Sequence, residues 1–123
     1  MDLEERTRDL FAALSAGPAA AITAFLAKDA VFEVVDLLPA ISRDKLDPML
    51  ARAYAKAPPV RLKVVALKVK RNVVFVGWKA TGDIPGSGPG ELDGLAVINW
   101  DQDGQVMRLD IHLGEEVAAR LRP

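Results

Sequence analysis

The sequence predicts an α+β fold in which three N-terminal helices pack on one curved, mostly antiparallel sheet. Helical periodicity is confined to the first half of the chain, whereas the apolar–polar alternation of strands fills residues 60–113. A run of strands after a run of helices is typical of α+β proteins. Within residues 60–70 the alternation changes phase, which predicts a β-bulge and a bend in the sheet. A sheet that bends around a few helices forms a cone with an open mouth.

Three segments carry helix signals. The first helix is predicted over residues 2–16. Asp2 can cap its first turn, and a glycine follows its last residue. A second helix is predicted to begin at a proline and run over residues 18–28. The third helix is predicted over residues 47–57. It begins with an Asp-Pro pair, and two prolines follow its last residue and end it.

The other segments read as strands and their connections. The expected strands are residues 30–36, 60–70, 73–81, 92–100 and 104–114. Residues 37–43 are expected to be irregular, and the Gly/Pro-rich residues 82–91 are expected to form a flexible hairpin connection. The tail, residues 115–123, is expected to add a helical turn.

Composition narrows the classes of function. The 123 residues suit a single domain over residues 1–123, and the net charge of −1 argues against nucleic acid as a partner. The chain has no cysteine and one histidine, which argues against disulfides and a zinc site, and we expect no metal and no cofactor. The charged N-terminus and the lack of a long apolar run predict a cytoplasmic protein that binds no membrane.

Three stretches carry a resemblance to a known superfamily. They are LFAALSAGPAAAITAFLAKDAVFEV (10–34), PAISRDKLDPMLARAY (39–54) and DQDGQVMRLDIHLG (101–114). Together with the order of elements, they resemble the nuclear transport factor 2-like superfamily in its SnoaL-like, ketosteroid isomerase-like and limonene epoxide hydrolase-like branches. The resemblance implies a cone-shaped α+β barrel and a homodimer that forms through the outer face of the sheet. It also implies a small hydrophobic ligand, such as a polyketide, steroid or terpenoid-like molecule.

The catalytic positions of two branches are not retained. By alignment, the base, the phenol and the carboxylic acid of the isomerase-like enzymes fall on Val34, Leu10 and Ala96, all of which are apolar. The water-holding set of the epoxide hydrolase-like branch falls near Ile111, Gly77, Lys79, Phe32 and Val34, where its residue types are absent. We therefore expect neither activity by its familiar mechanism.

Two other side chains are candidates for acid–base chemistry. Asp36 lies on the same face of its strand as Val34 and could act as a general base at the rim of an apolar pocket. The alternative is a carboxylate that caps residues 37–42. Lys79 could act as a nucleophilic amine in the pocket, but the apolar pattern that includes Trp78 favours an exposed strand lysine.

The expected pocket is lined mainly by alternate strand residues. Its polar handles would be the Tyr54 hydroxyl and the indole N–H groups of Trp78 and Trp100, unless these rings only fill the core or an interface. The full set is Phe32, Val34, Tyr54, Trp78, Ala96, Ile98, Trp100, Leu109, Ile111 and Leu113. On the last strand, Asp110 and His112 alternate with these apolar residues. We therefore expect a polar stripe or an interface pair there, and only a register slip would bring them into the pocket.

Two classes of function remain open. One is an isomerase, cyclase or hydrolase that acts on a small hydrophobic molecule by acid–base chemistry. The other is a non-catalytic ligand-binding or dimeric assembly protein of the same fold. An enzyme needs at least one titratable group that points into the cavity, so the placement of Asp36 and Lys79 discriminates between the two.

Overall fold

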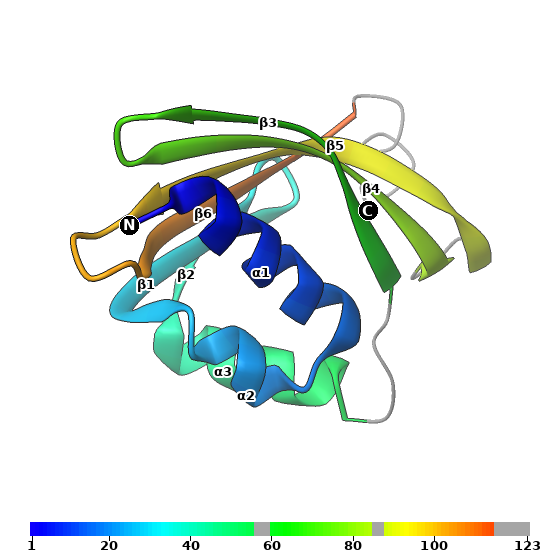
Figure 1. Cartoon of the computed structure of the whole chain (residues 1–123). Coiled ribbons are helices and arrows are strands. Elements are labelled where there is room, and N and C mark those ends of the chain that lie inside the picture. Colours follow the sequence, from blue (N-terminus) through cyan, green and yellow to red (C-terminus); the bar gives the residue numbers. More distant parts are fainter. Residues whose placement is uncertain (56–59, 85–87, 115–123) are drawn as a thin grey trace.

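The computed structural model describes residues 1–55, 60–84 and 88–114, and it shows a six-stranded sheet that curves over helices on one side (Figure 1). The strand order is β2-β1-β6-β5-β4-β3, so that β2 and β3 are the edges of an open sheet. The helices are α1 (Leu3–Ala16), α2 (Ala19–Thr23) and α3 (Arg43–Ala53). The strands are β1 (Leu26–Val34), β2 (Leu38–Ser42), β3 (Val60–Lys70), β4 (Val73–Ile84), β5 (Gly88–Trp100) and β6 (Val106–Leu113). The α+β class is confirmed, and the sheet is antiparallel except where β1 pairs with β6.

Helix α1 has the predicted ends. The Asp2 carboxylate accepts a hydrogen bond from the backbone N–H of Glu5 at 3.2 Å. Gly17 ends the helix with φ +69° and donates its N–H to the carbonyl of Ala13, as expected of a C-terminal glycine. The helix buries Thr7, Leu10 and Phe11 against the sheet.

The predicted boundary between the second helix and the first strand is wrong. Helix α2 ends at Thr23, and β1 has already begun at Leu26. The carbonyl of Phe25 accepts a hydrogen bond of 2.7 Å from the N–H of Val106 in β6, so pairing with a distant strand overrides local helix propensity. Residues 37–43 are also not irregular, because β2 pairs with β1 after a turn in which Asp36 has φ +68°.

Helix α3 begins four residues earlier than predicted and ends earlier. It begins at Arg43, after Ser42, and Pro48 lies inside it. The side chains of Arg43 and Asp47, four residues apart, form an ion pair across its first turn. The helix ends at Ala53.

The meander β3–β6 follows the sequence pattern most closely. The phase change in β3 is a bulge between Val64 and Ala66, as predicted. The Gly/Pro-rich connection is shorter than predicted, because β4 and β5 continue into it and Gly82 pairs with Gly90. Residues 85–87 of that connection lie outside the described residues, as does the predicted helical turn at 115–123.

The two faces of the sheet differ in polarity. The alternation of apolar and polar residues in β4 correctly predicts which of its side chains face inward. Lys79 is exposed, whereas the buried residues of this strand are Val74, Val76, Trp78 and Ala80. The inner face packs against α1 and α3 to form the core. None of the helices in the described ranges is long and apolar enough to cross a membrane.

Candidate functional site

The residues predicted to line a pocket come together on the inner face of the sheet. Five of them are buried in the core, namely Trp78, Ala96, Ile98, Trp100 and Leu109, and Phe32, Ile111 and Leu113 pack against it. Val34 pairs with Ile111 and is half-buried. The arrangement provides a continuous apolar surface with few polar groups.

The buried polar side-chain atoms between the sheet and α1 have no hydrogen-bond partners among the described residues. Within residues 1–55, 60–84 and 88–114, Thr7 is the only fully buried residue with a polar or charged side chain. Its hydroxyl and the indole N–H groups of Trp78 and Trp100 are buried and have no hydrogen-bond partner among the described residues. A buried donor without an acceptor costs about 1–3 kcal/mol, so each of these atoms is a place where an acceptor would be stabilised.

The two indoles lie far apart on the inner face, Trp78 in the middle of β4 and Trp100 at the end of β5. Trp78 pairs with Gly94, and Trp100 follows Gly94 by six positions on β5, which corresponds to roughly 20 Å along the strand. The Trp78 ring lies directly over Gly94, where an added Cβ would be 2.7 Å from Trp78 Cζ2. Glycine opposite a buried tryptophan was the sequence signal for this close approach.

The Trp100 end is covered by an arginine. The guanidinium of Arg6 lies 4.6 Å from the ring centre of Phe25 and 5.8 Å from that of Trp100. Its Nε donates to the carbonyl of Gly104 at 2.8 Å, which ties α1 to the β5–β6 turn. Trp100 is therefore enclosed at this end.

The Tyr54 hydroxyl is committed to the protein backbone. It donates to the carbonyl of Leu14 at 2.6 Å and so joins the end of α3 to α1. Burial raises the pKa of Tyr54 above its ordinary value of 10.0. The ring is thus a structural link at the edge of the core.

Tyr54 is the only tyrosine, so its titration can be followed directly. We expect the tyrosinate absorbance at 295 nm to rise with a midpoint above that of the urea-unfolded protein. Because the folded state keeps this proton more tightly, its contribution to stability is complete below pH ~10 and is lost as the pH rises further. Tyr54→Phe should reduce that alkaline loss, and identical folded and unfolded midpoints would contradict the assigned burial.

Neither acid–base candidate lies among the buried residues of the inner face. Asp36 is exposed in the β1–β2 turn, where it lines a shallow depression of about 320 Å³ with Glu33 and residues 37–39. Lys79 is exposed on the outer face, and its Nζ lies 3.5 Å from Oε1 of Glu91.

Asp110 and His112 are not paired with each other in the polar stripe of the outer face. Asp110 accepts hydrogen bonds from Nε of Arg108 at 3.0 and 3.1 Å, and Arg108 also lies 3.5 Å from Glu33. The hydrogen bond with Asp110 and its charge raise the pKa of Arg108. His112 is exposed, so the predicted polar stripe is an ion-pair cluster of Glu33, Arg108 and Asp110 with His112 beside it.

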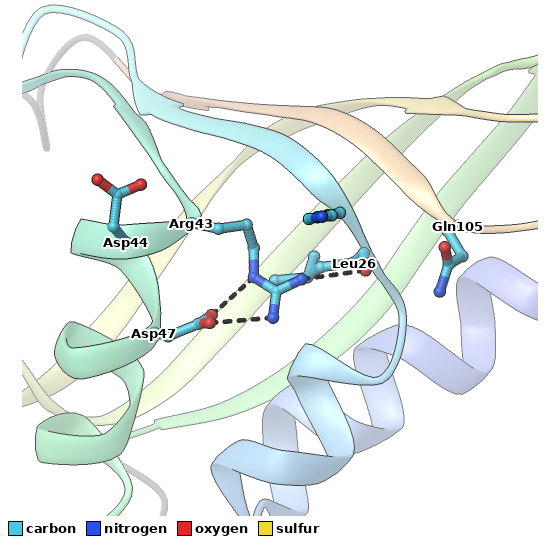
Figure 2. A pocket seen from close by; sticks show the side chains of 6 residues that line it. Leu26, Arg43, Asp44, Asp47 and Gln105 are labelled. Atoms are coloured by element: carbon cyan, nitrogen blue, oxygen red, sulfur yellow. Dashed lines mark hydrogen bonds and ion pairs between the residues drawn. The ribbon is translucent and has the colours of Figure 1, made fainter.

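A second, polar depression of about 400 Å³ lies between α3 and the start of β1 (Figure 2). The Arg43 guanidinium binds both oxygens of Asp47 at 2.8 and 3.0 Å, and its Nη1 donates to the carbonyls of Leu26 and Ala27. Both carbonyls belong to the part of β1 in which the regular pairing with β6 is interrupted. Arg43 therefore supplies hydrogen-bond donors to carbonyls that β6 does not regularly pair. Sequence analysis missed this pair, although the four-residue spacing was visible.

The remaining walls of this depression do not make it a chemical site. Figure 2 shows Asp44 turned away from Asp47 and Gln105 on the opposite side. Asp44 accepts a hydrogen bond from the Ser42 hydroxyl, which lowers its pKa. No group of three metal-ligating side chains exists among the described residues. We interpret the Arg43–Asp47 pair as a clamp between a helix and a strand.

Comparison with known proteins agrees with this architecture. Residues 7–109 match the SnoaL-like domain family. Among solved structures, a hypothetical protein with a ketosteroid isomerase-like fold from Catenulispora acidiphila, in complex with trimethylamine, is similar, with a TM-score of 0.74. It is 15% identical, and the similarity covers 87% of this chain and 83% of that one. None of the curated proteins matches the chain in sequence. The chain belongs to the SnoaL-like domain family of the nuclear transport factor 2-like superfamily.

Proposed function

We propose that the protein binds a small, neutral, mainly hydrophobic molecule in the cone that the sheet and the helices form, near Trp78, where Ile111 and Leu113 of the inner face are only partly buried. The observation that carries this proposal is the apolar inner face, on which the buried indole N–H groups of Trp78 and Trp100 have no hydrogen-bond partner among the described residues. Trp78 is the donor best placed to meet a ligand, because Arg6 covers the other indole. A ketone, ester or ether oxygen on the ligand would accept from Trp78 Nε1.

Binding without catalysis is the function that the geometry supports best. Proton transfer needs a titratable group beside the bound molecule. Asp36 and Lys79 are both exposed, and Lys79 is paired with Glu91. Among the described residues, the buried core between the sheet and the helices carries only Thr7 of α1 and the two indoles as polar groups. An isomerase, cyclase or hydrolase of this fold would lack the acid–base groups expected from the sequence.

Nile red, a neutral dye with one carbonyl oxygen, is a suitable first probe. We expect saturable binding, seen as a blue-shifted increase in its fluorescence. Trp78→Phe keeps a ring but removes the N–H, and we expect it to weaken binding roughly 5-fold, the equivalent of one hydrogen bond of about 1 kcal/mol. Progesterone, which has two ketone oxygens, should compete with the dye.

Two matched variants control this experiment. Trp100→Phe makes the same chemical change at the indole that Arg6 covers, and its affinity for the dye should stay within about 2-fold of wild type. Asp36→Asn changes an exposed residue and should also stay within about 2-fold of wild type. Equal loss in both tryptophan variants would contradict the role of Trp78. Absence of saturable binding by the wild type to both probes would remove the proposal.

We also propose that the outer face of the sheet binds a second copy of the chain. Large apolar side chains are exposed on it, including Phe75 at 36% and Leu95 at 40%. Leu95 pairs with Gly77, two positions from Phe75, so the two side chains are diagonal neighbours on adjacent strands. An apolar patch flanked by charges on an otherwise polar face is typical of a protein interface.

A further inference from the structure

Strand β3 is an edge of the open sheet, and a side chain of α1 caps one residue of this edge. The Ser15 hydroxyl accepts from the backbone N–H of Leu62 at 2.7 Å and donates to its carbonyl at 3.0 Å. Both backbone groups of Leu62 therefore point away from β4, and Ser15 occupies the place that a neighbouring strand would take. Figure 1 shows the other half of β3, toward its turn with β4, as the border of the sheet with the helices below it.

The backbone groups of two later residues on β3 have the same orientation. In an antiparallel pair, residues that bond to the partner strand alternate with residues whose N–H and C=O point outward. Strand β4 has no bulge, so this alternation continues from Ala80, the partner of Leu62, to the positions four and six residues before it. The β3 residues opposite those positions are Leu67 and Val69. Their outward N–H and C=O groups have no partner strand within residues 1–55, 60–84 and 88–114.

The exposed polar side chains along this edge are positively charged. Strand β3 has no acidic residue, and its cations are all exposed, namely Arg61, Lys63, Lys68 and Lys70. None of the four forms an ion pair with another described residue. One of them, Lys63, is paired across the strands with a further cation, Lys79 of β4. The edge therefore presents positive charge that no described carboxylate neutralises.

The two sides of this edge differ in polarity. Leu67 and Val69 pair with buried valines of β4, so their side chains lie on the inner face. There Leu67 packs against the core, whereas Val69 remains 41% exposed. Lys68 and Lys70 alternate with them and lie on the outer face. A strand beside β3 would thus need apolar side chains next to Leu67 and Val69, and carboxylates next to the two lysines.

We propose that this edge binds an extended segment of a partner protein, in which acidic and apolar residues alternate, as a seventh strand of the sheet. Main-chain hydrogen bonds to Leu67 and Val69 would supply affinity, and the alternating side chains would supply specificity. The inference depends on neither the ligand nor the pairing of two copies proposed above.

Charge argues against a second copy of the chain as the added strand. Pairing β3 with β3 of another copy would bring lysines of the same face side by side, and lysine on an edge strand is a common protection against such pairing. An acidic segment is attracted by the same charges. The opposite edge, β2, is a poorer site, because it has five residues and includes Pro39, which has no N–H to donate.

A fluorescein-labelled peptide of alternating glutamate and valine is the probe, and its binding would be followed by fluorescence anisotropy at low salt. We expect saturable binding to the wild type. Two other labelled peptides, one of alternating lysine and valine and one of glutamate alone, should bind at least about 10-fold more weakly. The peptide of glutamate alone carries more negative charge but lacks the apolar side chains and the strand propensity.

Val69→Pro separates strand addition from attraction between charges. The proline removes an N–H that points to the peptide and not to β4, so the sheet should keep its own pairing. The affinity for the glutamate–valine peptide should fall about 10-fold or more. Val69→Ile keeps the N–H and is the control, with an affinity expected within about 2-fold of wild type.

A charge reversal tests the outer side of the edge. The double variant with Lys68→Glu and Lys70→Glu should lose the glutamate–valine peptide and bind the lysine–valine peptide instead. Lys45→Glu makes the same kind of change at an exposed position of α3 and should alter neither affinity.

Amide hydrogen exchange gives a readout that needs no substitution. In the free protein, the amides of Leu67 and Val69 should exchange faster than those of Lys68 and Lys70, which bond to β4. The glutamate–valine peptide should slow exchange mainly at Leu67 and Val69. The proposal would be overturned by no saturable binding, by equal binding of the three peptides, by full affinity of Val69→Pro, or by unchanged exchange of these two amides at saturation.

Discussion

Gly94→Ala is expected to destabilise the protein by about 3 kcal/mol or more, the largest effect of any single methyl group that the structure identifies. A Cβ at this position would overlap the backbone carbonyl oxygen of His112 on β6 and lie 2.7 Å from the ring of Trp78. The carbonyl belongs to the sheet and cannot rotate away like the end of a side chain. The indole would therefore shift as well, and dye binding should weaken along with stability.

Gly77→Ala is the matched control for this prediction. Gly77 is in β4 of the same sheet, but a Cβ there would meet the side chain of Ala66 at 3.4 Å and that of Val65 at 3.6 Å, which are ordinary contacts. Urea unfolding should show a change within about 0.5 kcal/mol for Gly77→Ala. If the two substitutions lowered the free energy of unfolding equally, the close approach at Gly94 would not be the cause of the loss.

Arg43→Met is expected to lower the free energy of unfolding by about 2–3 kcal/mol. The substitution keeps most of the aliphatic stem but removes the paired bonds to Asp47 and the donors to the Leu26 and Ala27 carbonyls. Arg43→Lys should recover only part of the loss, because an ammonium cannot bind a carboxylate in two places and reach two carbonyls at once.

Arg8→Met provides the comparison for Arg43. Arg8 also forms an ion pair with an acid four residues away, Glu4, but both side chains are exposed and the distance is 3.4 Å. Such pairs contribute about 0.3–0.5 kcal/mol. Urea unfolding of both variants would give the two losses of stability. Amide hydrogen exchange in residues 27–30 would show whether the loss in Arg43→Met arises at the start of β1. A loss no larger than that of Arg8→Met would contradict the clamp.

The sequence was most informative where a local pattern and the tertiary structure agree. The alternation of β4 predicted that Trp78 is buried and Lys79 exposed, and the phase change in β3 predicted the bulge beside Val65. The capping of α1 by Asp2 was equally local. Each of these features depends on residues within a few positions of one another, which is the range that periodicity and capping describe.

The errors arose where distant segments decide the structure. The pairing of β1 with β6 begins at Leu26 and shortens the second helix, which no feature of residues 18–28 reveals. The early start of α3 depends on Arg43, whose bonds reach back to carbonyls of β1. In the candidate site, the apolar lining was predictable from alternation, whereas the unpaired indoles were not, because pairing depends on what the rest of the chain places beside them.

The parallel pairing of β1 with β6 also has a consequence for the order of folding. Strands β3, β4, β5 and β6 are joined to their chain neighbours as hairpins, so they can form from local contacts, which is fast. Strands β1 and β2 can join the sheet only through β6, the last strand of the described chain. During synthesis, β1 emerges before all the other strands but completes its pairing last, so the edge of β1 that pairs with β6 stays open until β6 has been made.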